Sequence, residues 1–257
     1  MNRSHRMASI LSWVLTFLCV APFAYIFWKS LMDSQAGFTL EYYYEVFLAQ
    51  EQYLLRFWKS LAICLCITLG QVAVSTLAGY GFAKCRFPGK NALFFLLMVL
   101  MIMPLQVTLV PSYIMLNKLD LLDTYYALVL PMIFVPLGTF IMTQSFRSVP
   151  SDIIQAARLD GCGTLGVILR IAAPMNKAGL ICTTLLSFLD GWNMVEQPIV
   201  YLKEFGKYPL SVALASVPPE NPTVQLVGCM LAILPPLFLF SYFNRELVEG
   251  IAIGGEK

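Results

Sequence analysis

The stretch QAARLDGCG (residues 155–163) lies between long apolar runs, and those runs decide the fold of the chain. The protein has 257 residues, of which 58% are hydrophobic and only 12% charged. Soluble domains carry roughly 25% charged residues. Apolar runs of about 20 residues therefore place the chain in a lipid bilayer. Two interpretations of QAARLDGCG remain: a polar loop between buried helices, or a surface for another molecule.

Six apolar segments are long enough to cross about 30 Å of hydrocarbon at about 1.5 Å per residue. They are predicted at residues 10–31, 59–82, 92–116, 125–146, 178–201 and 224–243. The prediction is an all-α integral membrane protein that forms a single transmembrane domain over residues 1–257. The first segment follows Arg3 and Arg6, as in a signal peptide, but it exceeds the roughly 7–15 residues of such a segment and lacks a cleavage site. We expect it to be a retained membrane helix.

The basic residues are unevenly distributed among the loops. Eleven Lys and Arg residues lie in the two tails and in the loops 83–91 and 147–177, against six elsewhere. Because basic loops remain in the cytoplasm, we expect both termini and the loop between the fourth and fifth spans to be cytoplasmic. The net charge of +2 is too small to indicate a nucleic-acid partner.

Three other features are of lesser weight. The segment FTLEYYYEVF (38–47) predicts a short helix at the membrane surface. The proline-broken loop 201–223 is expected outside the bilayer, facing an extracytoplasmic partner. The seven cysteines show no C-x-x-C spacing and the sole histidine is His5, so neither a disulfide framework nor a metal site is predicted.

Local signals divide the segment VPSDIIQAARLDGCGTLGVILRIAAP (149–174) into two short helices. Pro150 and Asp152 favour a helix start, and Gly161 suits the left-handed residue that ends a helix. A second helical stretch is expected over about 164–172. The loop 148–174 should form a compact knuckle outside the membrane.

Residue chemistry leaves two uses for this knuckle open. It is an interfacial hairpin if its apolar residues pack on the bundle, namely Ile153, Ile154, Leu165, Ile168 and Leu169. It is a docking surface if another protein approaches its small residues, Ala156, Ala157 and Gly161.

The predicted fifth span carries polar residues along one line. Asp190 lies near the bilayer midplane, where a carboxylate costs about 2.5–3.5 kcal/mol and normally faces a bundle interior or a wet cavity. At 100° per residue its neighbours on that stripe are Thr183, Ser187, Met194 and Gln197, with Asn193 at the edge. A sugar needs such donors and acceptors, although polar groups also bind neighbouring helices. Gln106 and Thr108 in the third span are lesser candidates.

The knuckle resembles the EAA motif of binding-protein-dependent ABC transporter permeases, in the AAxxDG form of the carbohydrate-uptake branch. The matching residues are Ala156, Ala157, Asp160, Gly161, Ile171 and Pro174. Other segments resemble that branch in the same order: FAKCRFPGK (82–90), residues 103–131, YPLSVALA (208–215) and VEGIAIGGEK (248–257). The last resembles the tail of the second, smaller permease of maltose-type transporters.

The resemblance implies a permease subunit that translocates a sugar or oligosaccharide delivered by a solute-binding protein, in the cell membrane of a prokaryote. Its implied partners are a second permease, two ATP-binding cassette subunits and the extracytoplasmic solute-binding protein. ATP and Mg would be bound by the ATPase subunits. This chain would hold no cofactor and no catalytic residue, and its sequence contains no phosphate-binding loop.

The resemblance also implies which residues couple to the ATPase. In the knuckle these are Asp152, Gln155, Ala156, Ala157, Arg158, Asp160, Gly161 and Gly163. In the C-terminal tail they are Glu249, Gly250, Gly254 and Gly255. The substrate path would include Ser187, Asp190, Asn193, Met194, Gln197, Gln106 and Thr108.

Two residues depart from the family pattern. Gln155 stands where the motif has glutamate, so a charge pair with the ATPase becomes a neutral hydrogen bond, and Lys59 replaces a usual asparagine. Two alternatives also remain: an importer of the same class that carries a non-sugar such as glycerol phosphate, and a passive channel or membrane scaffold.

Overall fold

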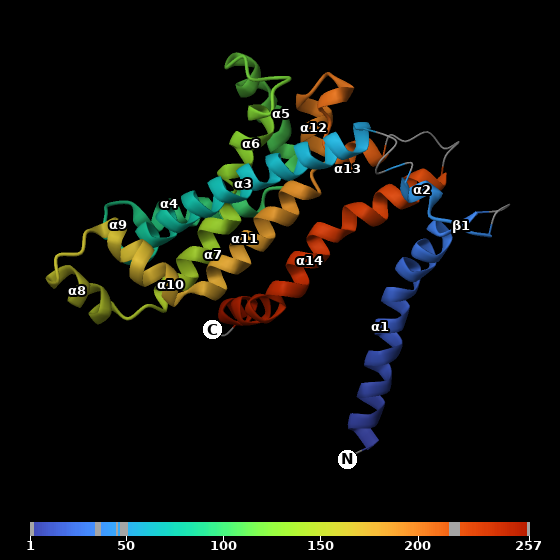
Figure 1. The fold of residues 1–257 in the computed structure, drawn as a ribbon. Coiled ribbons are helices and arrows are strands. Elements are labelled where there is room, and N and C mark those ends of the chain that lie inside the picture. The colour runs from blue at the N-terminus through green and yellow to red at the C-terminus, as the bar shows by residue number, and fades with distance from the viewer. Residues whose placement is uncertain (1–2, 34–36, 45, 47–50, 216–221, 256–257) are drawn as a thin grey trace.

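The computed structural model describes residues 3–33, 37–44, 46, 51–215 and 222–255, which are almost entirely helical (Figure 1). The longer helices are α1 (Arg3–Ser30), α3 (Glu51–Lys84), α4 (Lys90–Ile102), α5 (Leu105–Lys118), α7 (Pro136–Arg147), α11 (Lys177–Trp192) and α14 (Pro222–Gly255). The shorter ones are α2 (Glu41–Tyr44), α6 (Tyr126–Ile133), α8 (Ser151–Leu159), α9 (Thr164–Val167), α10 (Ala173–Met175), α12 (Glu196–Tyr201) and α13 (Leu210–Ala215). A π-helical turn spans Ile168–Ala172 and a 3₁₀ turn spans Phe205–Lys207.

One feature departs from the all-α prediction. Strands β1 (Met32–Asp33) and β2 (Gly37–Phe38) pair antiparallel directly after α1. The surface helix predicted within 38–47 is present in part, as α2. Both elements lie at the same end of α1 (Figure 1).

Four stretches are long and apolar enough to cross a membrane: Leu11–Ser30, Tyr53–Lys84, Tyr126–Arg147, which includes the short break between α6 and α7, and Gln225–Asn244. They correspond to the first, second, fourth and sixth predicted spans. The other two spans exist only if two bent helix pairs each cross once, namely Lys90–Ile102 with Leu105–Lys118, and Thr164–Met175 with Lys177–Trp192. The described residues thus contain four to six candidate spans.

The predicted third span, over 92–116, is sharply bent in the structure. Helices α4 and α5 meet at an angle of 106°. Met103 is extended, with ψ 128°, because a residue that precedes a proline is driven out of the helical region, and Pro104 lacks an N–H donor. Pro111, in contrast, stays inside α5.

The prediction of a continuous fifth span over 178–201 is wrong. Helix α11 ends at Trp192 and α12 begins only at Glu196. Pro198 cannot donate to the carbonyl of Met194 four residues earlier. That carbonyl instead accepts a hydrogen bond from Ser211 Oγ at 2.6 Å, which stabilises the break.

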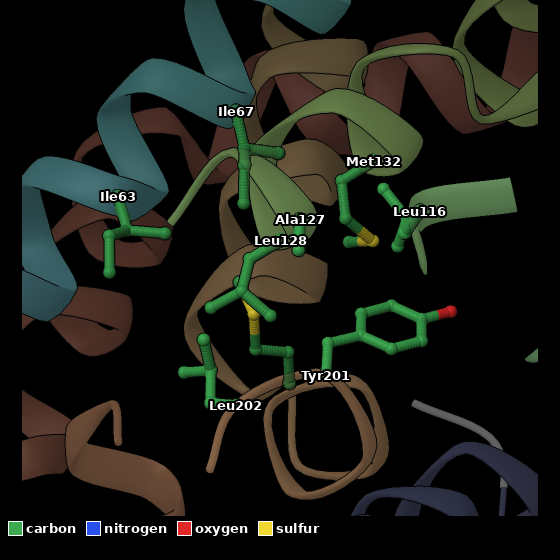
Figure 2. Close-up of a cluster of buried hydrophobic side chains, with 9 residues drawn as sticks. Ile63, Ile67, Leu116, Ala127, Leu128, Met132, Tyr201 and Leu202 are labelled. Carbon is green, nitrogen blue, oxygen red and sulfur yellow. The ribbon is translucent and has the colours of Figure 1, made fainter. Parts of the chain in front are cut away.

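The ends of the broken helices are held together by one buried apolar cluster (Figure 2). It contains residues from α3, α5, α6 and α12, with Met194 from the second break and Leu202 after α12: Ile63, Ile67, Leu116, Ala127, Leu128, Met132, Met194, Tyr201 and Leu202. Because these residues come from distant parts of the chain, the cluster holds the far end of α5 and the break at Met194 against α3.

Glycines bring the central helices unusually close. A Cβ atom added to Gly79 of α3 would lie 2.6 Å from Met142 Cβ in α7. A Cβ on Gly179 of α11 would overlap Ser145 Oγ, also in α7. Small residues of this kind permit close backbone approach in membrane helix bundles. Helix α1, in contrast, leans away from this bundle and contacts α14, and most of its side chains are exposed (Figure 1).

Candidate functional site

The knuckle begins with helix α8, which projects from one end of the bundle (Figure 1). Pro150 stands in front of its first residue, with extended backbone. At its other end Gly161 has φ +80°, Cys162 N–H donates to Ala157 O at 2.9 Å, and Gly161 N–H donates to Arg158 O at 3.1 Å. These two bonds form a Schellman motif, so the predicted helix and its glycine stop are confirmed.

Helix α8 has one buried face and one exposed face. Ile154 and Ala157, the latter 8% exposed, pack in a cluster with Tyr80, Phe146 and Val149. The remaining predicted coupling residues of the knuckle are exposed: Asp152, Gln155, Ala156, Arg158, Asp160, Gly161 and Gly163. Seven of the eight predicted coupling residues of the knuckle are therefore accessible, and Ala157 lies on the face of α8 that packs on the bundle.

The second limb of the knuckle is longer than predicted. Helical backbone runs from Thr164 to Met175 through the π-helical turn, so Pro174 lies within it, and the chain then bends by 90° into α11. Ile168 is buried whereas Leu165 and Leu169 are exposed. The knuckle thus packs on the bundle through part of its apolar residues only.

Hydrogen bonds fix both ends of the knuckle to the bundle. Lys84 Nζ donates to Val149 O at 2.5 Å and to Arg147 O at 3.3 Å. At the bend, Ser148 Oγ donates to Asn176 Oδ1 at 3.2 Å, and Asn176 Nδ2 donates to a backbone carbonyl of the second limb at 3.0 Å. A force applied to α8 would therefore reach α3, α7 and α11.

The predicted polar stripe of the fifth span is divided by the structure. Thr183 and Ser187 are buried, whereas Asp190 and Asn193 are exposed. The hydroxyl oxygens of Thr183 and Ser187 have no hydrogen-bond partner among the described residues. Thr183 faces α7, because a Cβ added to Gly138 would lie 3.1 Å from Thr183 Cγ2.

The other two stripe residues lie beyond the break, so the assumed helical spacing does not apply to them. Met194 is buried in the cluster of Figure 2, and Gln197 Nε2 lies 3.7 Å from Met132 Sδ. The prediction of one polar line through 183–197 is wrong, because it required an unbroken helix.

A polar pair that the sequence reasoning missed joins the two broken spans. Gln106 Nε2 donates to Glu196 Oε1 at 3.0 Å and is 3.3 Å from Oε2. Both side chains are exposed, and each follows a helix break by a few residues. Thr108, the other candidate in α5, donates to Leu105 O at 2.9 Å. Broken helices at membrane depth commonly line a cavity, and Glu196 is therefore a further candidate path residue.

At the opposite end from the knuckle, Asp123 and Lys207 join two loops. Asp123 has φ +60°, its Oδ2 accepts from Lys207 Nζ at 2.7 Å, and its Oδ1 accepts from the Lys203 amide at 2.9 Å. The hydrogen bond from Lys207 has the largest effect on this carboxyl, and together with the backbone bonds it lowers the pKa of Asp123 to about 2. The same pair raises the pKa of Lys207.

The predicted C-terminal coupling residues lie in the last part of α14, which continues to Gly255. The backbone of Glu249, Gly250, Gly254 and Gly255 is helical, and the side chain of Glu249 lies outside the described part of the chain.

Broken helices, close glycine packing and a knuckle at one end define a polytopic helical membrane protein. The chain belongs to the family of binding-protein-dependent transport system inner membrane components, which matches residues 71–250.

Similar proteins include two permeases for arabinooligosaccharides. The permease protein AraQ of Bacillus subtilis is 32% identical over 78% of this chain and 73% of its own length. AraQ of Halalkalibacterium halodurans is 28% identical over 98% of this chain and 99% of its own. The sn-glycerol-3-phosphate permease protein UgpE of Yersinia enterocolitica is 27% identical over 79% of this chain and 74% of its own.

The fold is also that of a solved structure. A chain of a bacterial ABC transporter involved in the import of the acidic polysaccharide alginate superposes with a TM-score of 0.77 at 22% identity. The match covers 96% of this chain and 98% of the other.

Proposed function

We propose that this chain is a permease subunit of an ABC importer that moves a sugar or oligosaccharide, delivered by a solute-binding protein and driven by ATP hydrolysis in two partner subunits. The observation that carries the proposal is the knuckle: a glycine-capped helix, exposed on one face and tied to three bundle helices. Family membership and the AraQ relatives support the transporter class and the cargo.

In the proposed topology the bent pair Lys90–Ile102 with Leu105–Lys118 crosses the membrane once, and Lys177–Trp192, continued by the break and α12, also crosses once. Together with the other four spans this makes six, with both termini and the coupling loop 148–174 in the cytoplasm and one domain over 1–257. The exposed apolar surface of α1 is available to a second permease or to lipid. The exposed knuckle residues would contact the ATPase, and the end of α14 would extend toward it.

The proposed substrate path follows the two helix breaks. Asp190, Asn193, Gln106 and Glu196 are exposed there and supply hydrogen-bond donors and acceptors for hydroxyl groups. Met194 and Gln197 are buried beside the second break and would support it, whereas Ser187 is buried within α11.

A second candidate cargo is an organic phosphate, because UgpE proteins are also similar to this chain. The two exposed carboxylates, Asp190 and Glu196, disfavour an anion in the path. Binding of neutral oligosaccharides and of glycerol phosphate to the solute-binding protein that co-purifies with the chain would decide between them.

Gly161→Val tests the coupling role of the knuckle. No atom lies within 4 Å of an added Cβ, so the substitution produces no clash, but a β-branched residue at φ +80° is strained by more than about 1–2 kcal/mol and should change the turn. We expect an assembled complex without substrate-stimulated ATPase activity.

Gly81→Val is the matched control. It adds the same bulk to a helical glycine of α3 that lies outside the proposed coupling surface and has no atom within 4 Å of an added Cβ. It should retain coupling. Normal stimulation of the ATPase in Gly161→Val would contradict the proposal.

A further inference from the structure

Two adjacent hollows lie beside the knuckle, where α3 ends and α4 begins. The first, of about 490 Å³, is lined by one face of α8 and by the end of α3: Lys84, Cys85, Arg86, Ser151, Ile154, Gln155 and Arg158. The second, of about 340 Å³, is lined by Arg86, Phe87, Gly89, Lys90, Asn91 and Ala92. Arg86 belongs to both, so four cationic side chains surround one continuous region.

The positive charge of this region is not compensated by carboxylates of the described residues. Both ion pairs among them are made by Lys207, at the other end of the bundle. Lys84 and Lys90 donate to neutral backbone carbonyls, the latter to Cys85 O at 2.9 Å. Asp152 and Asp160 belong to α8 and its cap but do not line either hollow. The region therefore favours an anion with more than one charge or a large one.

The surroundings of the hollows are those of a membrane surface. The continuous span Tyr53–Lys84 ends at the first hollow. Helix α4 begins at the second and carries exposed apolar side chains along its length, among them Leu93, Phe95 and Leu96, and Phe87 is exposed between the two. A cationic region that continues into an apolar helix surface matches a phosphate headgroup with attached acyl chains. A free phosphate would not bind the apolar surface of α4.

We propose that Lys84, Arg86, Lys90 and Arg158 form a binding site for the phosphate headgroup of an anionic phospholipid, such as cardiolipin or phosphatidylglycerol. Basic pockets at the ends of membrane helices bind such headgroups. Since Arg158 belongs to α8, a bound lipid would join the knuckle to the α3–α4 loop. The assignment of this site to the cytoplasmic leaflet rests on the proposed topology, whereas headgroup binding itself does not.

The test is lipid binding to the full-length chain in detergent, measured by native mass spectrometry. Cardiolipin and phosphatidylglycerol should bind and phosphatidylcholine should not. Arg86→Gln combined with Arg158→Gln should weaken cardiolipin binding by about 25-fold, because each surface cation contributes about a fivefold factor. Both side chains are exposed, so the fold should be retained.

Arg170→Gln combined with Lys177→Gln is the matched control. These two cations are exposed and lie in the same part of the chain, but they line neither hollow. The control variant should bind cardiolipin like the wild type. An equal loss in the control, or binding of phosphatidylcholine as tight as that of cardiolipin, would overturn the proposal.

Two further outcomes would also overturn it. Displacement of the lipid by excess inorganic phosphate would make the region a site for a soluble anion. The variant Arg86→Gln with Arg158→Gln could also bind lipid normally but lose the co-purifying ATPase. That result would make the cationic region a protein contact. The lipid-binding measurement itself uses the chain without ATPase, receptor or sugar, so its failure is distinct from failure of the proposed transport function.

Discussion

Replacing Gly79 by alanine should force α3 and α7 apart. The added Cβ would lie 2.6 Å from Met142 Cβ, 2.9 Å from Met142 C and 3.0 Å from Thr143 N. Carbon atoms pack at about 3.5–4.0 Å, so α7 would have to move by roughly 1 Å. Two of these three atoms are backbone atoms, and a side-chain rotation cannot relieve the contact. Overpacking of this kind costs about 1–3 kcal/mol, against a gain of about 0.5–1 kcal/mol from replacing a helical glycine by alanine.

Gly81→Ala provides the opposite expectation in the same helix. No atom lies within 4 Å of its added Cβ, so only the helix gain of about 0.5–1 kcal/mol remains. Thermal unfolding can be followed with a thiol-reactive dye, because Cys64 and Cys182 are buried. The melting temperature should fall in Gly79→Ala and rise slightly in Gly81→Ala. A rise in both would refute the close α3–α7 contact.

Three other perturbations test separate parts of the molecule. Asp123→Asn should lower the melting temperature at neutral pH. The pKa of this carboxyl falls from 3.8 to about 2 on folding. The loss in melting temperature should therefore persist above about pH 4 and disappear as pH falls toward 2. A deficit that stays constant down to pH 2 would refute the Asp123–Lys207 link. Glu196→Gln removes about 1 kcal/mol from the charged hydrogen bond to Gln106. It should therefore raise the KM for sugar uptake by roughly fivefold while ATPase coupling persists. An unchanged KM would place the path elsewhere. Deletion of residues 249–257 should reduce substrate-stimulated ATPase activity, and full transport by the shortened chain would exclude a role for this tail in coupling.

Local signals made the knuckle predictable. A proline before α8, an aspartate in its first turn and a glycine after it act within a few residues, and the structure has the helix and its left-handed stop at those positions. Which face of α8 packs on the bundle was not predictable, because Ala157 is buried in a cluster that includes Tyr80 of α3 and Phe146 of α7.

The breaks in the membrane helices were harder to predict. Hydropathy reports length and composition, and it cannot distinguish Pro111, which α5 accommodates, from Pro104, at which the chain bends by 106°. The break in the fifth span depends on tertiary structure, because Ser211 donates to the carbonyl of Met194, which Pro198 cannot bind. The Gln106–Glu196 pair depends on both breaks and therefore had no signal at the level of sequence spacing.

The proposed function is tested most directly by reconstitution. The complex that co-purifies with the full-length chain is placed in liposomes with its solute-binding protein, and uptake of labelled oligosaccharide is measured with and without ATP. We predict uptake that requires both ATP and the solute-binding protein. Solute flux that persists without either of them would contradict the importer and favour a passive channel.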